Sequence, residues 1–222
     1  MFQPISTEEL ENRIGKLPFG RKRQAEIIVS LRDIDPKNII SVEVMPREYL
    51  GRVVRGVTLE GDSSIKPYAD CEITTSQVDP HDLKIGQTFI QREKYQQILE
   101  NFSNMFGGNF CVARGIAKLG PLIIFGTTKD GRPAAAHYLP PIIEEGNGIR
   151  FLLDGIHRNF LVKNVGTTIE SILIKGVKIR LPCSPESWNM IKAVEEKPPR
   201  EERYFDLHAE FFRNLKHTGI DG

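Results

Sequence analysis

The sequence predicts an α+β fold, with a small mixed sheet packed by short helices. Leu122–Phe125 is a short, continuously apolar run of the kind found in strands that are buried on both faces. Ile149–Leu153 and Ile169–Leu181 are also strand-like, the second with a bend at Gly176. Over Gln91–Phe106, apolar residues recur at helical spacing instead. Strands and helices therefore alternate along the chain.

The segment Gln91–Phe106 is the clearest amphipathic helix. Tyr95, Ile98 and Phe102 follow one another at intervals of three or four residues, which places them on one face. Gly107-Gly108-Asn109 is predicted to end the helix, because glycine and asparagine are typical helix terminators. Such an apolar stripe indicates a helix that packs on a core.

Residues 1–70 are predicted to form an N-terminal β-rich extension. Ser6-Thr7-Glu8-Glu9 has the pattern of a capping box, so a short helix should begin there. Ala25–Leu31 and Ile39–Met45 are rich in β-branched residues, and Asp35–Asn38 between them is a turn signal.

Residues 71–181 are predicted to form the core domain. An inserted hairpin is expected around Thr127–Gly148, because turn-forming residues lie at Lys129–Arg132 and at Glu144–Gly148. After this hairpin, a strand, a glycine break and a short helix over His157–Asn164 complete the pattern.

Residues 182–222 are predicted to form a C-terminal linker and helix. Glu195–Arg203 is charged and contains Pro198-Pro199, which is typical of a linker. The residues after it predict a last helix, a helical tail that buries some of its bulky side chains: Tyr204, Phe205, His208, Phe211, Phe212 and Leu215.

Composition restricts the class of protein. The formal net charge is +1, which gives no support for DNA as a partner. It does not exclude DNA, because a local basic patch would suffice. The three cysteines, Cys71, Cys111 and Cys183, form no metal-binding or disulfide pattern, and no metal site is predicted. No apolar run approaches the roughly 20 residues that cross a bilayer, and the N-terminus lacks a signal-peptide pattern. We therefore expect a cytoplasmic protein that does not enter a membrane.

The most informative segment is Asp154-Gly155-Ile156-His157-Arg158, between a predicted strand and a predicted helix. The first N–H groups of a helix lack intrahelical partners, and the helix dipole favours negative charge there. Gly155 permits a tight turn, Arg158 can form paired hydrogen bonds to phosphate, and His157 can donate another. Asp154 could cap the helix or help to hold a metal-bound phosphate. This pattern predicts an anion site at a helix N-terminus; an ordinary helix with an N-cap and surface side chains fits the same residues.

The segment Phe151–Arg158, followed by a short helix, Gly166 and the β-rich Ile169–Ile174, resembles the ParB/sulfiredoxin superfamily. In that family a loop of similar sequence leads a helix whose N-terminus holds nucleotide phosphates. Upstream, Ile90-Gln91-Arg92-Glu93 resembles the family's arginine box, and Gly120–Ile124 resembles its proline-led strand. The resemblance covers residues 71 to 181 and implies a nucleotide-binding core in which Gln91, Arg92 and residues 154–158 contact the nucleotide.

The branches of that family differ in chemistry. Sulfiredoxins carry a catalytic cysteine where this chain has Ile156. Chromosome-partition ParB proteins have a glutamate-arginine pair in place of His157-Arg158 and a following helix-turn-helix domain. The free-serine kinases have a similar loop and a carboxylate ahead of the arginine box, where this chain has Pro80-His81-Asp82. This resemblance implies that Asp82, or His81, is the catalytic base; a solvent-exposed turn fits the same three residues.

The leading hypothesis is a nucleotide-dependent phosphotransferase that acts on a small hydroxylated molecule, with ATP or another nucleotide and Mg²⁺ as cofactors. Phosphoryl transfer needs positive charge around the phosphates and a base for the attacking hydroxyl. Arg92, His157 and Arg158 would supply the charge, and Asp82 or His81 the base. The alternatives are a nucleotide-gated module that associates with DNA, without turnover, and a nuclease. The sequence leaves open whether the chain is an enzyme and how it oligomerises.

Overall fold

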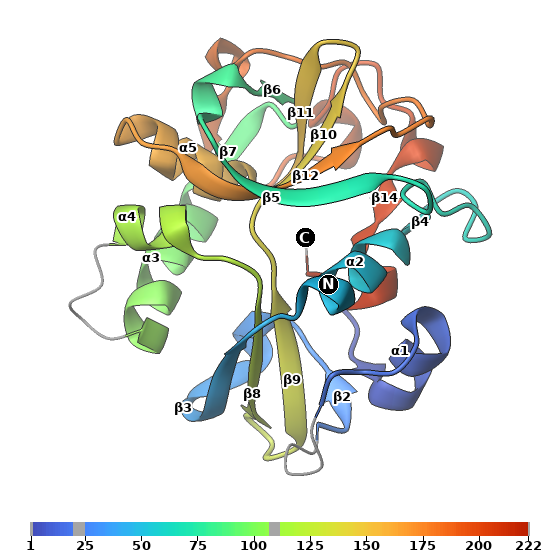
Figure 1. The fold of residues 1–222 in the computed structure, drawn as a ribbon. Helices are drawn as coiled ribbons and strands as arrows, with labels where there is room; N and C mark the ends of the chain where they lie inside the picture. Colours follow the sequence, from blue (N-terminus) through green and yellow to red (C-terminus); the bar gives the residue numbers. More distant parts are fainter. Residues whose placement is uncertain (1, 20–24, 107–111, 222) are drawn as a thin grey trace. The chain divides into compact units, whose positions relative to one another are not determined.

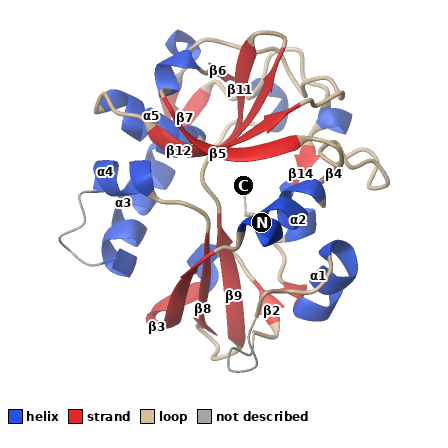
Figure 2. Cartoon of the chain, in the orientation of Figure 1, coloured by secondary structure: helices blue, strands red, loops and turns tan. Residues whose placement is uncertain are grey.

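The computed structural model describes residues 2–19, 25–106 and 112–221 and confirms the mixed α+β class. The chain folds into two compact units. Unit 1 comprises the described parts of Met1–Asp70, Gly120–Leu139 and Arg213–Gly222, and unit 2 comprises those of Cys71–Leu119 and Pro140–Phe212. Figure 2 shows that both contain strands and short helices or helical turns.

Unit 2 contains a five-stranded sheet in the order β5-β12-β10-β11-β6 (Figure 1). β10 pairs with β11 in a hairpin and lies parallel to β12; β5 and β12 are antiparallel, whereas β6 and β11 are parallel. The strands are β5 (Glu72–Val78), β6 (Lys84–Ile85), β10 (Ile142–Gly146), β11 (Ile149–Asp154) and β12 (Ile169–Lys175). The sheet is therefore mixed, as the sequence predicted. β12 is shorter than predicted, because the chain leaves it at Gly176, where φ is 85°.

Three helices of unit 2 lie beside one another, α3 (Arg92–Phe106), α4 (Val112–Lys118) and α5 (Ile156–Asn164) (Figure 1). The predicted helices at Gln91–Phe106 and His157–Asn164 are confirmed to within one residue at their starts. Gly107–Asn109, Cys111 and the side chain of Phe102 lie outside the part that the structure describes.

The remaining elements of unit 2 are short. β7 (Phe89–Gln91) leads directly into α3 and pairs in parallel with β13 (Lys192–Val194). The 3₁₀ turns are η2 (Pro80–Asp82), η3 (Trp188–Met190), η4 (Arg200–Glu202) and η5 (Ala209–Phe211).

One core cluster of unit 2 is formed mostly by residues of this sheet. Its members are apolar and almost completely buried, and burial of each such side chain contributes about 1.5–3 kcal/mol. The cluster consists of Val78, Leu83, Ile85, Ile143, Leu152 and Leu173, with Ile156, Trp188 and Ile191 packed against it. Ile156 belongs to the predicted site, so the first turn of α5 is anchored in the core.

The strand that follows Gly120 does not belong to the sheet of unit 2. Gly120–Ile124, which we assigned to the core by resemblance, belongs instead to unit 1, where β8 (Leu122–Thr128) begins. Pro141 precedes β10, and β10 lies between β11 and β12. The segment that leaves unit 2 is Gly120–Leu139, which contributes a β-hairpin to unit 1, whereas the hairpin predicted around Thr127–Gly148 would have spanned both units.

Unit 1 contains a five-stranded sheet in the order β1-β2-β9-β8-β3. Its strands are β1 (Ile5–Ser6), β2 (Ile27–Ile28), β3 (Ile34–Val44), β8 (Leu122–Thr128) and β9 (Pro133–Tyr138). β8 is buried along most of its length, as its continuous apolar sequence predicted. The described parts of residues 1–70 therefore lie in one compact unit together with Gly120–Leu139 and the described part of Arg213–Gly222.

Two local predictions for unit 1 need correction. Asp35–Asn38, predicted as a turn between two strands, lies within β3, where the pairing register shifts between Ile34 and Ile39. The Asp35 carboxylate accepts a hydrogen bond from the Lys37 amide, so the turn chemistry forms a bulge inside one strand. After the short turn η1 (Leu31–Asp33) and β3, the chain forms α2 (Arg47–Arg55), a helix that we did not predict, and then β4 (Thr58–Leu59).

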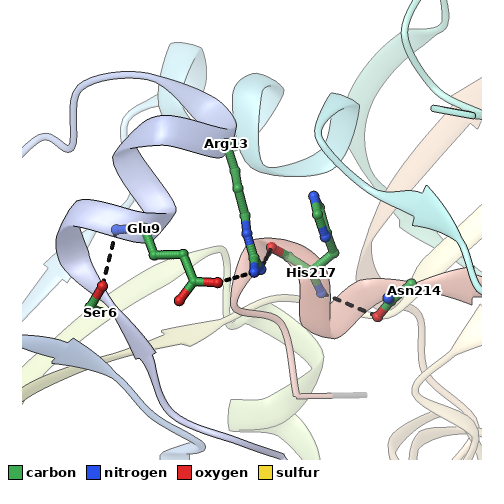
Figure 3. A network of polar contacts seen from close by, with 5 residues as sticks. All are labelled: Ser6, Glu9, Arg13, Asn214 and His217. Atoms are coloured by element: carbon green, nitrogen blue, oxygen red, sulfur yellow. Dashed lines mark hydrogen bonds and ion pairs between the residues drawn. The ribbon is translucent and has the colours of Figure 1, made fainter. Parts of the chain in front are cut away.

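The C-terminal segment closes unit 1 without forming the predicted helical tail. β14 (Arg213–Asn214) pairs with β4, and η6 (Leu215–Thr218) follows. Arg13 of α1 (Thr7–Ile14) donates to the carbonyl oxygen of His217 at 2.7 Å and pairs with Glu9 (Figure 3). Ser6 caps α1 by accepting from the Glu9 amide, as the capping box predicted. None of the described helices is long and apolar enough to cross a membrane.

Candidate functional site

The segment Asp154–Arg158 forms a strand, a left-handed residue and a helix, in that order. β11 ends at Asp154, Gly155 has a φ of 93°, and α5 begins at Ile156. A Cβ atom on Gly155 would lie 2.9 Å from Pro141 Cβ and 3.1 Å from the guanidinium of Arg158. Both the backbone conformation and the close approach therefore require glycine here.

Arg158 and Asp154 form an ion pair across this turn. The guanidinium of Arg158 donates to the carboxylate of Asp154 at 3.0 Å, and their side chains are only 14% and 18% exposed. The pair holds the arginine over the first turn of α5, where the unsatisfied N–H groups of the helix lie. Asp154 therefore pairs with the predicted cation and does not cap α5, whose N-cap residue is Gly155 and has no side-chain cap hydrogen bond.

Asn159 is a site residue that sequence reasoning missed. Its backbone N–H and its side-chain amide both donate to the carbonyl oxygen of Gly155, at 3.0 and 3.1 Å. The side chain is fully buried, and its Oδ1 atom has no hydrogen-bond partner among the described residues. Asn159 therefore fixes the loop from the core side. The sequence signal that could have identified Asn159 is a polar residue on an otherwise apolar helix face.

His157 links this loop to the start of α3. The backbone N–H of Gln91 donates to Nε2 of His157 at 3.1 Å, so Nε2 carries no proton and the neutral ring holds its proton on Nδ1. Burial, together with the positive charges of Lys94, Arg158 and Lys197, lowers the pKa of His157 from 6.5 to about 4. The imidazole is thus neutral at pH 7 and lies among three cations.

Arg92 follows Gln91 directly, but its side chain makes a different contact. Its Nε pairs with Glu195 at 3.0 Å, and both side chains are mostly exposed. The N-termini of α3 and α5 therefore meet through Gln91 and His157, whereas the guanidinium groups of Arg92 and Arg158 pair with different carboxylates, Glu195 and Asp154.

Pro80-His81-Asp82 forms η2, which lies against α5. The Asp79 side chain caps the turn by accepting from the His81 amide, and the indole N–H of Trp188 donates to the carbonyl oxygen of Pro80 at 2.7 Å. His81 and Asp82 are exposed. The structure thus places the predicted base next to the predicted phosphate-binding helix, on an exposed turn.

A small cleft opens beside the loop. Its cavity volume is about 60 Å³, several times the roughly 10–15 Å³ that one water molecule needs. The lining combines the loop with apolar and aromatic residues from the end of β6 and from the 182–212 segment: Gly86, Gln87, Phe151, Leu152, Leu153, Asp154, Gly155, Ile156, Pro182, Cys183, Tyr204 and Phe212. The segment predicted as a linker and tail therefore supplies one wall of the cleft.

The aromatic wall is ordered by contacts within that segment. Tyr204 and Phe212 meet edge to face, with ring centroids 4.9 Å apart. The guanidinium of Arg200 lies over the ring of Phe212 at 4.5 Å, within the range of cation–π attraction. A Cβ atom on Gly86, which also lines the cleft, would lie 2.7 Å from Cys183 Sγ and 2.8 Å from Phe151 Cζ, so this position also requires glycine.

No group of three or more His, Cys, Asp or Glu side chains that could hold a metal ion occurs in the residues that the structure describes. In comparisons with known proteins, no family model, no curated protein and no solved structure matches this chain. The geometry of the loop and the motifs that it contains are therefore the basis for assigning a function.

Proposed function

We propose that unit 2 binds a nucleotide and places its phosphate groups where the N-termini of α3 and α5 meet. The observation that carries this proposal is the 3.1 Å hydrogen bond from the Gln91 amide to His157 Nε2. It joins two segments that are 66 positions apart in sequence and that both resemble phosphate-contacting boxes. Each segment opens a helix of eight residues or more.

Electrostatics supports an anion at this position. Two helix N-termini contribute partial positive charge, and each favours a nearby anion by about 0.3–1 kcal/mol at an exposed site. Burial and the positive charges of Lys94, Arg158 and Lys197 together lower the pKa of His157. A phosphate group would be stabilised by these cations, and the Nδ1–H group of His157 would be a suitable donor to it.

The ion pair of Arg158 with Asp154 suits such a ligand. A phosphate oxygen can accept from the same guanidinium that Asp154 now occupies, because arginine offers five N–H donors. Asp154 would then help to hold a Mg²⁺ ion that accompanies the phosphates, since carboxylate oxygen is a preferred ligand of Mg²⁺. When bound, Mg²⁺ would neutralise charge on the transferred phosphoryl group.

The cleft beside the loop suits one part of the ligand. Its 60 Å³ is far below the roughly 300–1,000 Å³ of pockets that enclose a drug-sized ligand. A nucleotide would therefore lie across the opening, with its phosphates at the loop and an apolar part against Phe151, Tyr204 and Phe212.

As the activity of this site we propose phosphoryl transfer to a small hydroxylated molecule. Asp82 would take the proton of the acceptor hydroxyl while its oxygen forms a bond to the terminal phosphorus. The bond from that phosphorus to the bridging oxygen breaks, and a nucleoside diphosphate leaves. The position of η2 against α5 supports this assignment, and His81 is the alternative base. The order of segments along unit 2 is also similar to that of the ParB/sulfiredoxin superfamily, with the strand after Pro141 in place of the one after Pro121.

Nucleotide binding is tested by thermal shift with ATP, ADP, CTP and GTP, each with and without Mg²⁺, followed by titration calorimetry. A ligand at 100 times its Kd stabilises the folded state by about 2.7 kcal/mol. Arg158→Ala should weaken binding at least about tenfold, because it removes a charge-assisted contact. Arg150→Ala is the matched control, since Arg150 lies at the other end of β11 and pairs with Glu145. Equal affinity in both variants would remove Arg158 from the site.

Turnover is tested by a single-turnover assay with labelled nucleotide and a pool of hydroxylated metabolites. Asp82→Asn should keep nucleotide affinity and abolish transfer, because it removes a base and leaves the phosphate contacts in place. Transfer that survives in Asp82→Asn assigns the base elsewhere, with His81 next. Absence of transfer by the wild type, with nucleotide binding intact, would favour the nucleotide-gated binding module.

A further inference from the structure

β3 forms one edge of the unit 1 sheet, and an apolar stripe follows it. Among the described strands, β8 is its pairing partner. Ile40, Val42 and Val44 alternate along the strand and are 73%, 41% and 78% exposed. Edge strands are usually protected by several charges or by proline, yet Glu43 is the one charged residue in Ile39–Val44.

The backbone of the same strand also points outward at these positions. The Met45 N–H group donates to the carbonyl oxygen of Pro121 at 2.9 Å, so the Met45 amide faces the β8 side. Successive residues of a strand direct their N–H and C=O groups to opposite sides. The polar backbone groups of Val44 and Val42 therefore face the open edge of the sheet. The outward backbone groups thus belong to two of the three stripe residues, whereas Ile40 lies where the pairing register with β8 shifts, between Ile39 and Ser41.

We propose that β3 pairs antiparallel with β3 of a second copy of this chain, about a two-fold axis at Val42. In this register Val42 faces its own counterpart, and each Val44 faces the Ile40 of the second copy. Each Glu43 faces a Ser41, so the pairing places no like charges opposite each other. Pairing through such a two-fold axis keeps both stripes on the same face of a continuous sheet.

Self-complementarity favours a second copy over an unrelated strand. Opposed apolar or β-branched pairs stabilise a sheet, whereas opposed like charges destabilise it. The one charge of the stretch meets a hydroxyl, and Ser41 already donates to Glu43 at 3.1 Å within its own strand. The proposal depends on unit 1 alone and is independent of the nucleotide site.

Sedimentation velocity of the full chain, over a range of concentrations, tests the proposal. The wild type should reach twice its mass of 25.1 kDa. Val42→Lys and Val42→Glu should each raise the dimer dissociation constant at least about tenfold, because like charges then face each other at the axis. An equal mixture of the two variants should restore the dimer. Lys37→Glu, on an exposed part of the same strand, is the control and should dimerise like the wild type.

A cysteine variant gives a second readout that does not depend on dissociation. Hydrogen-bonded antiparallel pairs have Cα atoms about 5.5 Å apart, within the 4.4–6.8 Å range of disulfides. Val42→Cys should therefore form an intermolecular disulfide on mild oxidation, and Ser41→Cys should not. A monomeric wild type, a dimer that both charged variants retain, or a mixture that stays monomeric would each overturn the proposal.

Discussion

The substitution Gly155→Ala examines the loop that the whole site depends on. Gly155 has a φ of 93°, and an added Cβ would lie 2.9 Å from Pro141 and 3.1 Å from Arg158. A residue with a Cβ costs about 1–2 kcal/mol in the left-handed region. Overpacking against neighbours adds roughly 1–3 kcal/mol. The expected loss in the free energy of unfolding of unit 2 is therefore about 2–5 kcal/mol.

Two glycines of unit 2 separate these contributions. Gly148 and Gly166 also have positive φ values, of 73° and 65°, but a Cβ on either would meet no atom within 4 Å. Gly148→Ala and Gly166→Ala should therefore lose only the conformational part, about 1–2 kcal/mol. The excess loss in Gly155→Ala measures the contact with Pro141 and Arg158.

Urea unfolding followed by tryptophan fluorescence measures these losses. Trp188 is the chain's single tryptophan, and it packs against the core cluster of unit 2, so the signal reports that unit. A loss in Gly155→Ala no larger than that of the two control variants would refute the packing argument. It would show that the loop relaxes around the added methyl group.

Two further predictions concern pH and the C-terminal closure. Because the pKa of His157 falls from 6.5 to about 4 on folding, the unfolded chain takes up a proton first as the pH falls below 6.5. The free energy of unfolding is then lost progressively down to about pH 4, by up to roughly 3 kcal/mol. In urea unfolding followed by Trp188 fluorescence, His157→Gln should show a shallower decline with falling pH than the wild type. Parallel declines in the two proteins would contradict this prediction. Arg13→Met should lower the free energy of unfolding of unit 1 by about 1.5–3 kcal/mol, because it removes a charged donor to the carbonyl oxygen of His217. The control is Arg132→Met, which breaks an exposed ion pair with Glu26. If unfolding followed by circular dichroism shows no larger loss for Arg13→Met than for the control, the contact between Arg13 and His217 does not stabilise unit 1.

Local chemistry made the site's own elements predictable. α3 was predicted because its apolar residues repeat at helical spacing. The start of α5 was predicted because glycine permits a tight turn after a strand, and Gly155 has a φ of 93° in the structure. Because the starts of α3 and α5 could be predicted, Arg92 and Arg158 could be placed in the first turns of these helices. Their actual partners, Glu195 and Asp154, depend on side-chain directions that a repeat pattern does not contain.

Strand assignment was less predictable because pairing is non-local. Pro121 and Pro141 each precede an apolar run, and either run reads as a buried strand. Only the pairing shows that the run after Pro141 neighbours β11, while the run after Pro121 belongs to unit 1. The sequence could not decide between them, since both satisfy the same burial pattern.

The remaining wrong predictions concern sequence patterns that fit two kinds of secondary structure. In α2, Tyr49, Leu50, Val53 and Val54 are buried at helical spacing, but the adjacent valines also suit a strand. In the C-terminal segment, bulky side chains at helix-like spacing predicted a helix. The chain forms isolated 3₁₀ turns instead, and its aromatic rings pack in pairs within unit 2, where Tyr204 and Phe212 line the cleft.

The most direct test of the phosphate site is an NMR titration of isotope-labelled protein with ATP and, separately, with inorganic phosphate. We expect the largest shifts at the amides that open α3 and α5, near Gln91 and His157, together with a shift of the His157 ring nitrogens. Both ligands should perturb these signals, whereas ATP alone should also perturb Tyr204 and Phe212 in the cleft. Perturbations that leave Gln91 and His157 unchanged at saturating ATP would contradict the account.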